Sequence, residues 1–325
     1  MKAIVQDVYG PADVLQLRDI DKPAPGDDDV LIRVRAAGVD PSVWHLMTGQ
    51  PYPMRLMGFG LRTPRLRVRG WDVSGTVEAV GGNVTRFRPG DEVFGTCEGS
   101  FAEYACTPAD RLAAKPPGAG FEQAAAVPIS GFTALHSLRE EGRIQKGQRV
   151  LIIGAGGGVG TFAVQLAKAV FEAEVTGVCG KDKTELVRSL GADHVIDYTR
   201  DDFTTDSRRY DLVLDTAGNR PLSHLRRALA PRGTLVLVGG EGGGRWFGGL
   251  HRSLGALLLS PFIGQNLRAP FVKEPKEDVL QPLADYLESG RITPVIDRTY
   301  PLSEAADAVR HWEMGHTRGK LVLTV

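Results

Sequence analysis

The part of the sequence that most constrains the fold is Val150-Leu-Ile-Ile-Gly-Ala-Gly-Gly-Gly-Val-Gly160. An apolar run typical of a buried strand leads into a glycine-rich turn, and apolar side chains then recur at helical spacing. Glycines here let the chain reverse tightly, let backbone amides approach a pyrophosphate and let the helix pack on its strand. The helix N-terminus adds unpaired N–H groups and a positive dipole end. We predict a dinucleotide-binding loop, with a tight turn that binds nothing as the alternative; its residues are Gly154, Gly157, Gly158, Val159 and Gly160.

The residues about twenty positions after this loop bear on which dinucleotide is bound. An NAD site has a carboxylate at the end of the second strand, where it binds the ribose 2′-hydroxyl. Here no acid stands at Cys179 or Gly180, which follow the predicted strand, and Lys181 and Lys183 flank the region. A hydrogen bond to a charged group is worth about 1.5–3 kcal/mol, so two cations favour a 2′-phosphate and predict NADPH. Asp182 argues for NADH, although its position also predicts the N-cap of the next helix.

Later strand ends should face the same crevice, because the carboxyl ends of parallel strands meet at one edge of a sheet. Gly218 and Asn219 follow a strand predicted at residues 212–214, and Gly239 and Gly240 follow one at 234–238. Glycines let the backbone approach a ribose or nicotinamide closely. The alternative, that each of these residues is there only because the backbone turns at the strand end, explains them about as well.

The spacing of apolar residues changes along the chain. Residues 1–124 contain short β-like runs broken by Pro and Gly, which predicts a barrel or sandwich. Residues 125–271 alternate apolar strands with helical stretches, the pattern of a parallel sheet made of βαβ units. Residues 272–325 return to a mixed texture. Strands are predicted at 3–8, 30–37, 75–80, 92–94, 101–106, 150–153, 175–178, 194–196, 212–214, 234–238, 293–300 and 320–325, with helices near 277–289 and 303–312.

Composition excludes several classes of protein. The 325 residues include 39 Lys and Arg against 39 Asp and Glu, so no strong field favours nucleic acid or a membrane surface. The three cysteines are scattered, without a CxxC pair, which argues against a disulfide framework and against a four-cysteine zinc lobe. No signal peptide or bilayer-length apolar stretch is visible. We expect a cytoplasmic protein with a small-molecule substrate.

Four stretches together resemble the medium-chain dehydrogenase/reductase superfamily, in its zinc-independent quinone oxidoreductase branch. They are GTVEAVGGNVTRFRPGDEVFG, GAGGGVGTFAVQLAKA, LGADHVIDY and GHTRGK. The resemblance covers essentially the whole chain. It implies an α/β protein with a GroES-like β-rich N-terminal domain (residues 1–124, completed by 272–325) and a Rossmann domain (125–271) with a doubly wound parallel sheet. It also implies a homodimer.

The resemblance also implies roles for single residues. Lys183 and Tyr198 fall where NADPH-binding relatives contact the 2′-phosphate, and Thr133 falls near the nicotinamide. Lys320 lies where the C-terminal segment can reach the cofactor cleft. Gly180 departs from the pattern, because many relatives have Ser or Thr there and gain one phosphate hydrogen bond.

In zinc-dependent members of the superfamily, a Cys, the His of a Gly-His-Glu segment and a third ligand hold the catalytic metal. The resemblance places Asp40 at the Cys position and Gly70-Trp71-Asp72 at Gly-His-Glu. Trp cannot ligate zinc, and residues 128–130 offer no Cys, His or carboxylate, so we predict that no metal is bound. We expect Trp71 to fill the vacated space beside the nicotinamide, with Asp72 hydrogen-bonded nearby.

Ser42 and His45 occupy the positions of the proton relay of zinc alcohol dehydrogenases. A histidine near its ordinary pKa can move protons between solvent and a buried oxygen. A loop histidine and a capping serine packed by Trp44 explain the same residues about as well. The proton donor is thus His45, Tyr52 or water.

The predicted reaction is hydride transfer from NADPH to a quinone, enal or enone, because conjugated acceptors need little Lewis-acid assistance. One alternative is an alcohol dehydrogenase acting on unactivated carbonyls; another is a non-catalytic NADPH-binding sensor. The arginine-rich stretch 51–69 is either a lid or a solvated loop, and the apolar stretch 251–267 is either a substrate wall or a subunit contact.

Overall fold

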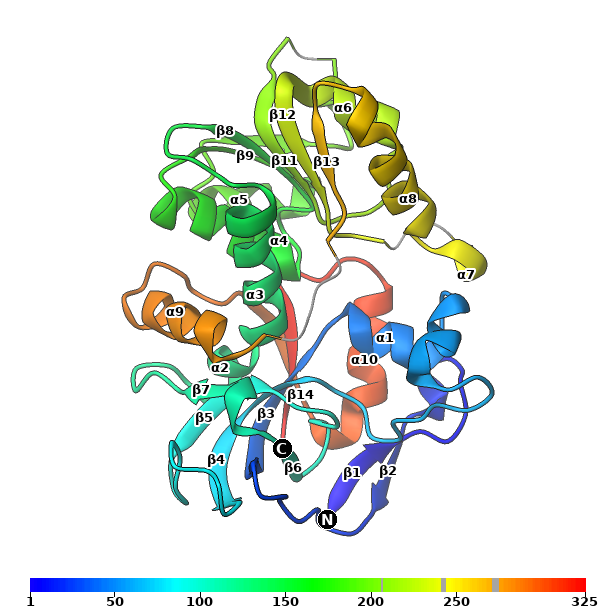
Figure 1. Ribbon diagram of the computed structural model, residues 1–325, viewed down its shortest axis with the longest axis vertical. Helices are drawn as coiled ribbons and strands as arrows, with labels where there is room; N and C mark the ends of the chain where they lie inside the picture. The colour runs from blue at the N-terminus through cyan, green and yellow to red at the C-terminus, as the bar shows by residue number, and fades with distance from the viewer. Residues whose placement is uncertain (206, 241–243, 271–274) are drawn as a thin grey trace. The chain divides into compact units, whose positions relative to one another are not determined.

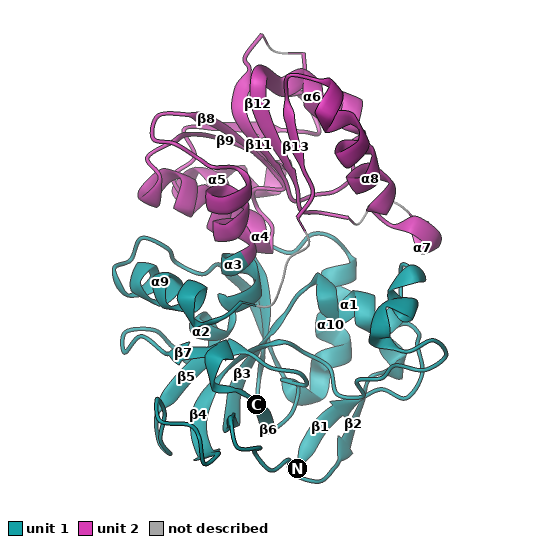
Figure 2. Cartoon of the chain, in the orientation of Figure 1, with its two compact units in different colours: residues 1–132, 273–325 teal, residues 133–272 magenta. Residues whose placement is uncertain are grey.

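The computed structural model describes residues 1–205, 207–240, 244–270 and 275–325 (Figure 1). The chain divides into unit 1, residues 1–132 and 273–325, and unit 2, residues 133–272 (Figure 2). The sequence placed the first boundary after residue 124, whereas the chain passes between the units within helix α3 (Pro128–His136). Within the described ranges, none of the helices has the length and apolar character needed to span a membrane.

Unit 1 is built around a seven-stranded sheet in the order β14-β15-β3-β4-β5-β7, with β6 also paired to β3 and a separate β1-β2 hairpin. The C-terminal strand pairs antiparallel with β3, with Leu321 opposite Val39 and Val322 opposite Gly38. The strands are β1 (Lys2–Val5), β2 (Gln16–Asp19), β3 (Asp29–Val39), β4 (Asp72–Val80), β5 (Glu92–Thr96), β6 (Tyr104–Pro108), β7 (Leu112–Ala114), β14 (Ile296–Pro301) and β15 (Lys320–Thr324). The helices are α1 (Pro41–Thr48), α2 (Phe121–Ala125), α9 (Glu277–Glu288) and α10 (Ala305–Glu313).

Unit 2 holds a six-stranded sheet, all parallel, in the order β10-β9-β8-β11-β12-β13. The order reverses between β8 and β11, the switch point at which doubly wound sheets bind ligands. Helices α4 and α5 pack against β8–β10, and α6 and α8 against β11–β13 (Figure 1). The strands are β8 (Arg149–Ile153), β9 (Glu174–Cys179), β10 (His194–Asp197), β11 (Tyr210–Asp215), β12 (Leu229–Leu237) and β13 (Asn266–Arg268). The helices are α4 (Gly158–Gln165), α5 (Thr184–Ser189), α6 (Leu222–Ala228), α7 (Gly244–Phe247) and α8 (Leu250–Leu259).

The predicted fold class is confirmed in its architecture: a β-rich unit, completed by the C-terminal segment, accompanies a doubly wound parallel sheet of the Rossmann type. Each predicted strand and each predicted helix coincides with an observed one to within a few residues. The sequence did not reveal β2, β7 and β13, because β2 is mostly exposed and polar and the other two have three residues each.

The prediction that Asp182 is the N-cap of the next helix is wrong. Residues Lys181–Lys183 form a 3-10 turn (η6), and α5 begins at Thr184 with Lys183 in the cap position. The turn moves the start of the α-helix beyond Asp182, so the carboxylate belongs to the turn that precedes it.

Replacing Gly160 with alanine should destabilise unit 2, because the added Cβ would lie 2.1 Å from the carbonyl oxygen of Gly154. Overpacking of this kind costs about 1–3 kcal/mol, so the midpoint of urea unfolding should fall. Gly255, within α8, is the matched control, since a Cβ there would meet only Leu222 Cδ2, at 3.8 Å. Alanine at Gly255 should raise the free energy of unfolding by about 0.5–1 kcal/mol through helix propensity. Effects of the same sign at both glycines would contradict this account.

Candidate active site

The glycine loop joins β8 to α4 within unit 2. Gly154 has a φ of +84°, and a Cβ at that residue would lie 2.5 Å from Thr216 Oγ1, so the turn requires glycine. Gly157 caps α4 from an extended conformation and offers no side chain to the first turn. The first amides of α4 therefore keep the anion-binding capacity of a helix N-terminus. The conformations of Gly154 and Gly157 are thus compatible with the predicted binding of a pyrophosphate to this loop.

The structure brings Lys183 to the same loop, since a Cβ built on Gly156 would lie 2.8 Å from Lys183 Cδ. The backbone amide of Lys183 donates to Gly180 O at 2.9 Å. The hydroxyl of Tyr198 would lie 3.6 Å from a Cβ built on Gly180. Lys183, Gly180 and Tyr198 thus gather at the end of β9, as the NADPH prediction requires. Asp182 Oδ1 also lies beside Gly180, 3.0 Å from such a Cβ, so the choice of NADPH over NADH stays a prediction.

At the end of β11, the buried carboxylate of Asp215 organises the strand ends of unit 2. Its Oδ1 accepts from the amides of Ala217 at 3.3 Å and Gly218 at 3.2 Å. Its Oδ2 pairs with Arg252 Nη2, and Arg252 Nη1 donates to Gly239 O at 3.3 Å. A Cβ on Gly218 would lie 2.7 Å from the backbone of Gly239, so close backbone packing accounts for these two glycines. Contacts of Gly218, Asn219, Gly239 and Gly240 with a cofactor stay predictions.

In unit 1, Asp72 at the start of β4 and Lys320 at the start of β15 form a fully buried ion pair. Lys320 Nζ lies 2.9 Å from Asp72 Oδ2, and the amide of Ile129, at the start of α3, donates to Oδ1 at 2.8 Å. Burial raises the pKa of Asp72 to about 6; Lys320 lowers this pKa and the neighbouring Asp40 raises it. The expectation that Asp72 is hydrogen-bonded is confirmed. The cofactor role implied for Lys320 stays a prediction, and the structure shows its ammonium held by Asp72.

Asp40 directly follows β3 and is the N-cap of α1. Its Oδ1 accepts from the amide of Ser42 at 2.8 Å and from the Ser42 hydroxyl at 2.5 Å. Its Oδ2 is buried and has no hydrogen-bond partner. In this structure, Ser42 therefore donates both of its hydrogen bonds to the capping carboxylate. Asp40 keeps one carboxylate oxygen without a partner.

His45 lies on α1, not in a loop, and its ring packs edge-on against Trp44 with ring centroids 5.1 Å apart. Its Nδ1 lies 2.8 Å from Gln50 O. A carbonyl only accepts, so Nδ1 carries a proton and Nε2 is the nitrogen at which a neutral ring can take one up. Tyr52 is half-buried under the guanidinium of Arg55, 4.9 Å from its ring centroid.

Of the remaining predicted residues, Thr133 is buried on α3, Lys181 is exposed and Trp71 is half-buried. No group of three or more His, Cys, Asp or Glu side chains in the described ranges is arranged to hold a metal ion. The residues at the zinc positions of the superfamily do not fit the metal, because Asp40 offers a carboxylate but Trp71 offers no ligand atom and residues 128–130 offer no Cys, His or carboxylate.

The sequence did not reveal the two buried ion pairs. Asp72 and Lys320 are 248 positions apart, and Asp215 and Arg252 are 37 apart. One signal was available: Arg252 is a charged residue in a helix that is otherwise almost wholly apolar, which indicates a buried partner. For Lys320, only the pairing of β15 with β3 reveals the neighbourhood of Asp72.

Two family models match the chain. The model described as alcohol dehydrogenase GroES-like domain matches residues 26–117, and the model described as zinc-binding dehydrogenase matches residues 190–323. The words zinc-binding in the description of the second model refer to the family. In this chain, the residues at the zinc positions do not fit the metal, as described above.

Curated relatives align over nearly the whole chain. A mouse protein named NAD(P)H oxidoreductase RTN4IP1, mitochondrial, is 34% identical over 100% of this chain and 89% of its own length. The NADPH-dependent alkenal/one oxidoreductase, chloroplastic, of Arabidopsis thaliana is 34% identical over 99% of this chain and 79% of its own. A quinone oxidoreductase of Pseudomonas aeruginosa is 33% identical over 97% of each chain.

Solved structures agree with these relatives. The quinone oxidoreductase of Coxiella burnetii has a TM-score of 0.88 at 29% identity and covers 100% of this chain and 99% of its own. A mycobacterial protein complexed with NADPH has a TM-score of 0.85 at 29% identity and covers 100% of both chains.

Removing Lys320 should leave the buried carboxylate of Asp72 without its cation. We expect Lys320→Met to lower the free energy of unfolding at pH 7 by about 3–5 kcal/mol. The loss should be smaller at pH 5. This pH is below the pKa of Asp72, which is about 6, so the carboxyl is mostly protonated and leaves no uncompensated charge. The double variant Asp72→Asn/Lys320→Met, measured by urea unfolding, is the matched control and should recover most of the loss. A double variant as unstable as the single one would show that the pair is not coupled.

Proposed function

The chain belongs to the medium-chain dehydrogenase/reductase superfamily, in its quinone oxidoreductase-like branch, and we propose that it reduces quinones or α,β-unsaturated carbonyls with NADPH. At a coarser level, it is an NAD(P)H-dependent oxidoreductase of the quinone and alkenal/one reductase type. The observation that carries the finer proposal is the position of Lys183 against the glycine loop. A cation there complements the 2′-phosphate that distinguishes NADPH from NADH.

The residues of unit 2 fit a dinucleotide. The first amides of α4, at Gly158, Val159 and Gly160, would bind the pyrophosphate. Lys181, Lys183 and Tyr198 would bind the 2′-phosphate. Thr133, the glycines at the ends of β11 and β12 and Lys320 are proposed to position the nicotinamide half. Bound NADPH would supply the hydride.

The residues of unit 1 would handle the acceptor. His45 and Tyr52 are the proposed donors of the proton to the enolate or quinol oxygen, and the bond from His45 Nδ1 to Gln50 O directs that exchange to Nε2. Asp40 and Ser42 would hold the start of α1, the helix that carries His45. Because Trp71 stands at the position of the zinc-binding histidine and offers no ligand atom, the proposed acceptor is one that conjugation already activates.

Two further expectations stay predictions. We expect a cytoplasmic homodimer that binds neither nucleic acid nor membrane, although the mouse and Arabidopsis relatives are named mitochondrial and chloroplastic. The apolar side chains of α8 and the turn that follows it are exposed within the described chain, which suits a subunit contact; they are Leu254, Leu257, Leu258 and Phe262.

Steady-state oxidation of NADPH tests the proposal. Menadione, 1,4-benzoquinone, hex-2-enal and but-3-en-2-one should be reduced, whereas the saturated partners hexanal and butan-2-one should react at least about a hundredfold more slowly, a barrier difference of about 2.7 kcal/mol. Turnover of the saturated carbonyls together with stoichiometric zinc in the purified protein would establish an alcohol dehydrogenase instead. Tight NADPH binding without turnover on any acceptor would establish a sensor.

The cofactor assignment has its own test. Lys183→Met should raise the KM for NADPH by about ten- to a hundredfold, because it removes a charge-assisted bond of about 1.5–3 kcal/mol, and should change the KM for NADH little. Lys146→Met is the matched control, since Lys146 is an exposed lysine of the same unit that pairs with Glu172. If the wild type uses NADH as well as NADPH, or if both KM values rise equally in Lys183→Met, the assignment of Lys181, Lys183 and Tyr198 is wrong.

A further inference from the structure

Arg69 is a buried cation of unit 1 without a partner. Its residue keeps 2% of its surface, and the guanidinium atoms Nε and Nη2 have no hydrogen-bond partner. The backbone of Arg69 is fixed, since its amide donates to Ile4 O and its carbonyl accepts from the amide of Phe101. Burial lowers the pKa of Arg69 to about 10, so the group stays charged at neutral pH.

The other buried cations of the described chain each have a carboxylate. Lys320 pairs with Asp72, Arg252 pairs with Asp215, and Lys115 pairs with Glu92 at 3.0 Å. No ion pair joins Arg69 to any described carboxylate, and the group that raises its pKa is the phenol of Tyr9. Leaving a charge buried and unpaired costs several kcal/mol, so Arg69 is unlike the cations that belong to the scaffold.

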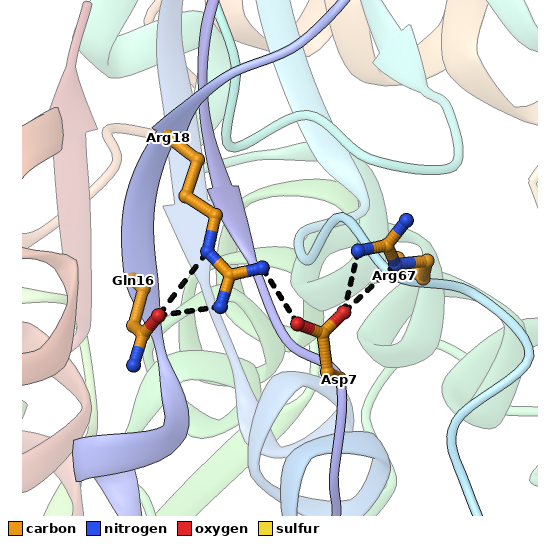
Figure 3. A network of polar contacts seen from close by, with 4 residues as sticks. All are labelled: Asp7, Gln16, Arg18 and Arg67. Carbon is orange, nitrogen blue, oxygen red and sulfur yellow. Dashed lines mark hydrogen bonds and ion pairs between the residues drawn. The ribbon is translucent and has the colours of Figure 1, made fainter.

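Asp7, the acidic residue that binds Arg67 two positions before Arg69, is already occupied. Figure 3 shows that Asp7 Oδ1 accepts from Nε and Nη2 of Arg67, at 2.9 and 2.5 Å, and that Asp7 Oδ2 accepts from Arg18 at 2.6 Å. Arg18 is in turn bound to Gln16. Arg67 and its partners are exposed at the surface. Asp7 therefore neutralises the exposed Arg67, whereas the buried Arg69 has no such partner.

The two unpartnered atoms of Arg69 are the pair that suits a carboxylate. Nε–H and one N–H of Nη2 point in parallel from the same edge of a guanidinium, so together they can bind both oxygens of one carboxylate. They are also the two atoms that Arg67 uses on Asp7. A monoanion suits the site better than a phosphate dianion, because it neutralises one guanidinium without excess charge.

Tyr9, the group that raises the pKa of Arg69, connects Arg69 to the segment that carries the proposed proton donors. The phenol of Tyr9 links them: the guanidinium of Arg55 lies 4.2 Å from the Tyr9 ring centroid and 4.9 Å from that of Tyr52. Arg55 also donates to Thr48 O and Gly49 O at the end of α1, the helix of His45. Nε and Nη2 of Arg55 are thus occupied by carbonyl oxygens, whereas the same two atoms of Arg69 have no hydrogen-bond partner.

We propose that Arg69 binds a carboxylate of the hydride acceptor, so that the substrate is a conjugated carbonyl compound or quinone that also carries an acidic group. This inference rests on the proposed function, which supplies the acceptor.

The test compares (E)-4-oxo-4-phenylbut-2-enoate with its methyl ester, two enones that differ in the charge. We expect the ratio of kcat/KM for the acid to that for the ester to fall by about ten- to a hundredfold in Arg69→Met, the loss of one charged hydrogen-bonded pair. Arg69→Lys should keep part of the preference. Arg65→Met, an exposed arginine of the same segment, is the matched control and should leave the ratio as it is in the wild type. An unchanged ratio in Arg69→Met overturns the proposal.

A second measurement needs neither turnover nor a variant. Calorimetry on the wild type with NADP⁺ would compare the saturated product 4-oxo-4-phenylbutanoate with its methyl ester, and the acid should bind at least about tenfold more tightly, or 1.4 kcal/mol. If neither enone oxidises NADPH but the acid still binds more tightly, the proposed function fails and the anion site stands. Equal affinities, or no binding of the acid at millimolar concentration, overturn the anion site whatever the activity.

Discussion

The buried ion pair of Asp72 and Lys320 joins three distant stretches of unit 1. Asp72 is the first residue of β4 and Lys320 the first of β15. Ile129, whose amide donates to Asp72, lies in the first turn of α3. Either partner alone would be an unpaired buried charge, which is strongly destabilising. The pair therefore favours the pairing of β15 with β3 that brings Lys320 to Asp72. The same contact engages the carboxylate that follows Trp71, the residue at the position of the zinc-binding histidine in the superfamily.

Unit 2 uses the same device at the end of β11. Asp215 binds two amides of the following turn with one oxygen and Arg252 of α8 with the other. In both units, a carboxylate at a strand terminus accepts from backbone amides, which are local in unit 2 and come from Ile129 in unit 1, and pairs with a cation from far along the chain. Such an arrangement satisfies every polar atom of the carboxylate, which is the condition under which a buried charge is stable. It also positions, without mobile side chains, the turn at the carboxyl end of the sheet, where doubly wound folds bind ligands.

The sequence predicted local features well and long-range pairing poorly. The loop at Gly154–Gly160, the parallel sheet and most strand positions followed from periodicity and glycine placement, which are local properties. The cap assigned to Asp182 was wrong because a 3-10 turn and an α-helix share the same start signals. The partners of Lys320 and Arg252, and the lack of one for Arg69, depend on which strands become neighbours, and nothing in the adjacent residues records that.

The charges of unit 1 are also ordered along helix α1. Asp40, with one unpartnered oxygen, stands at its N-terminus, and Tyr9, the neighbour of Arg69, packs at its C-terminal Gly49. A helix of eight residues spans about 12 Å, so opposite charges lie at opposite ends of the helix that carries His45. Each sign complements the helix dipole at its end. Asp40, with its unpartnered oxygen, disfavours a further negative charge near it, so the carboxylate of the proposed acceptor is better placed at the cationic end of the helix. The proposed proton donors belong to this same end, since His45 Nδ1 bonds Gln50 O and Tyr52 packs on Arg55, so in the proposal the oxygen that gains charge during reduction is protonated there.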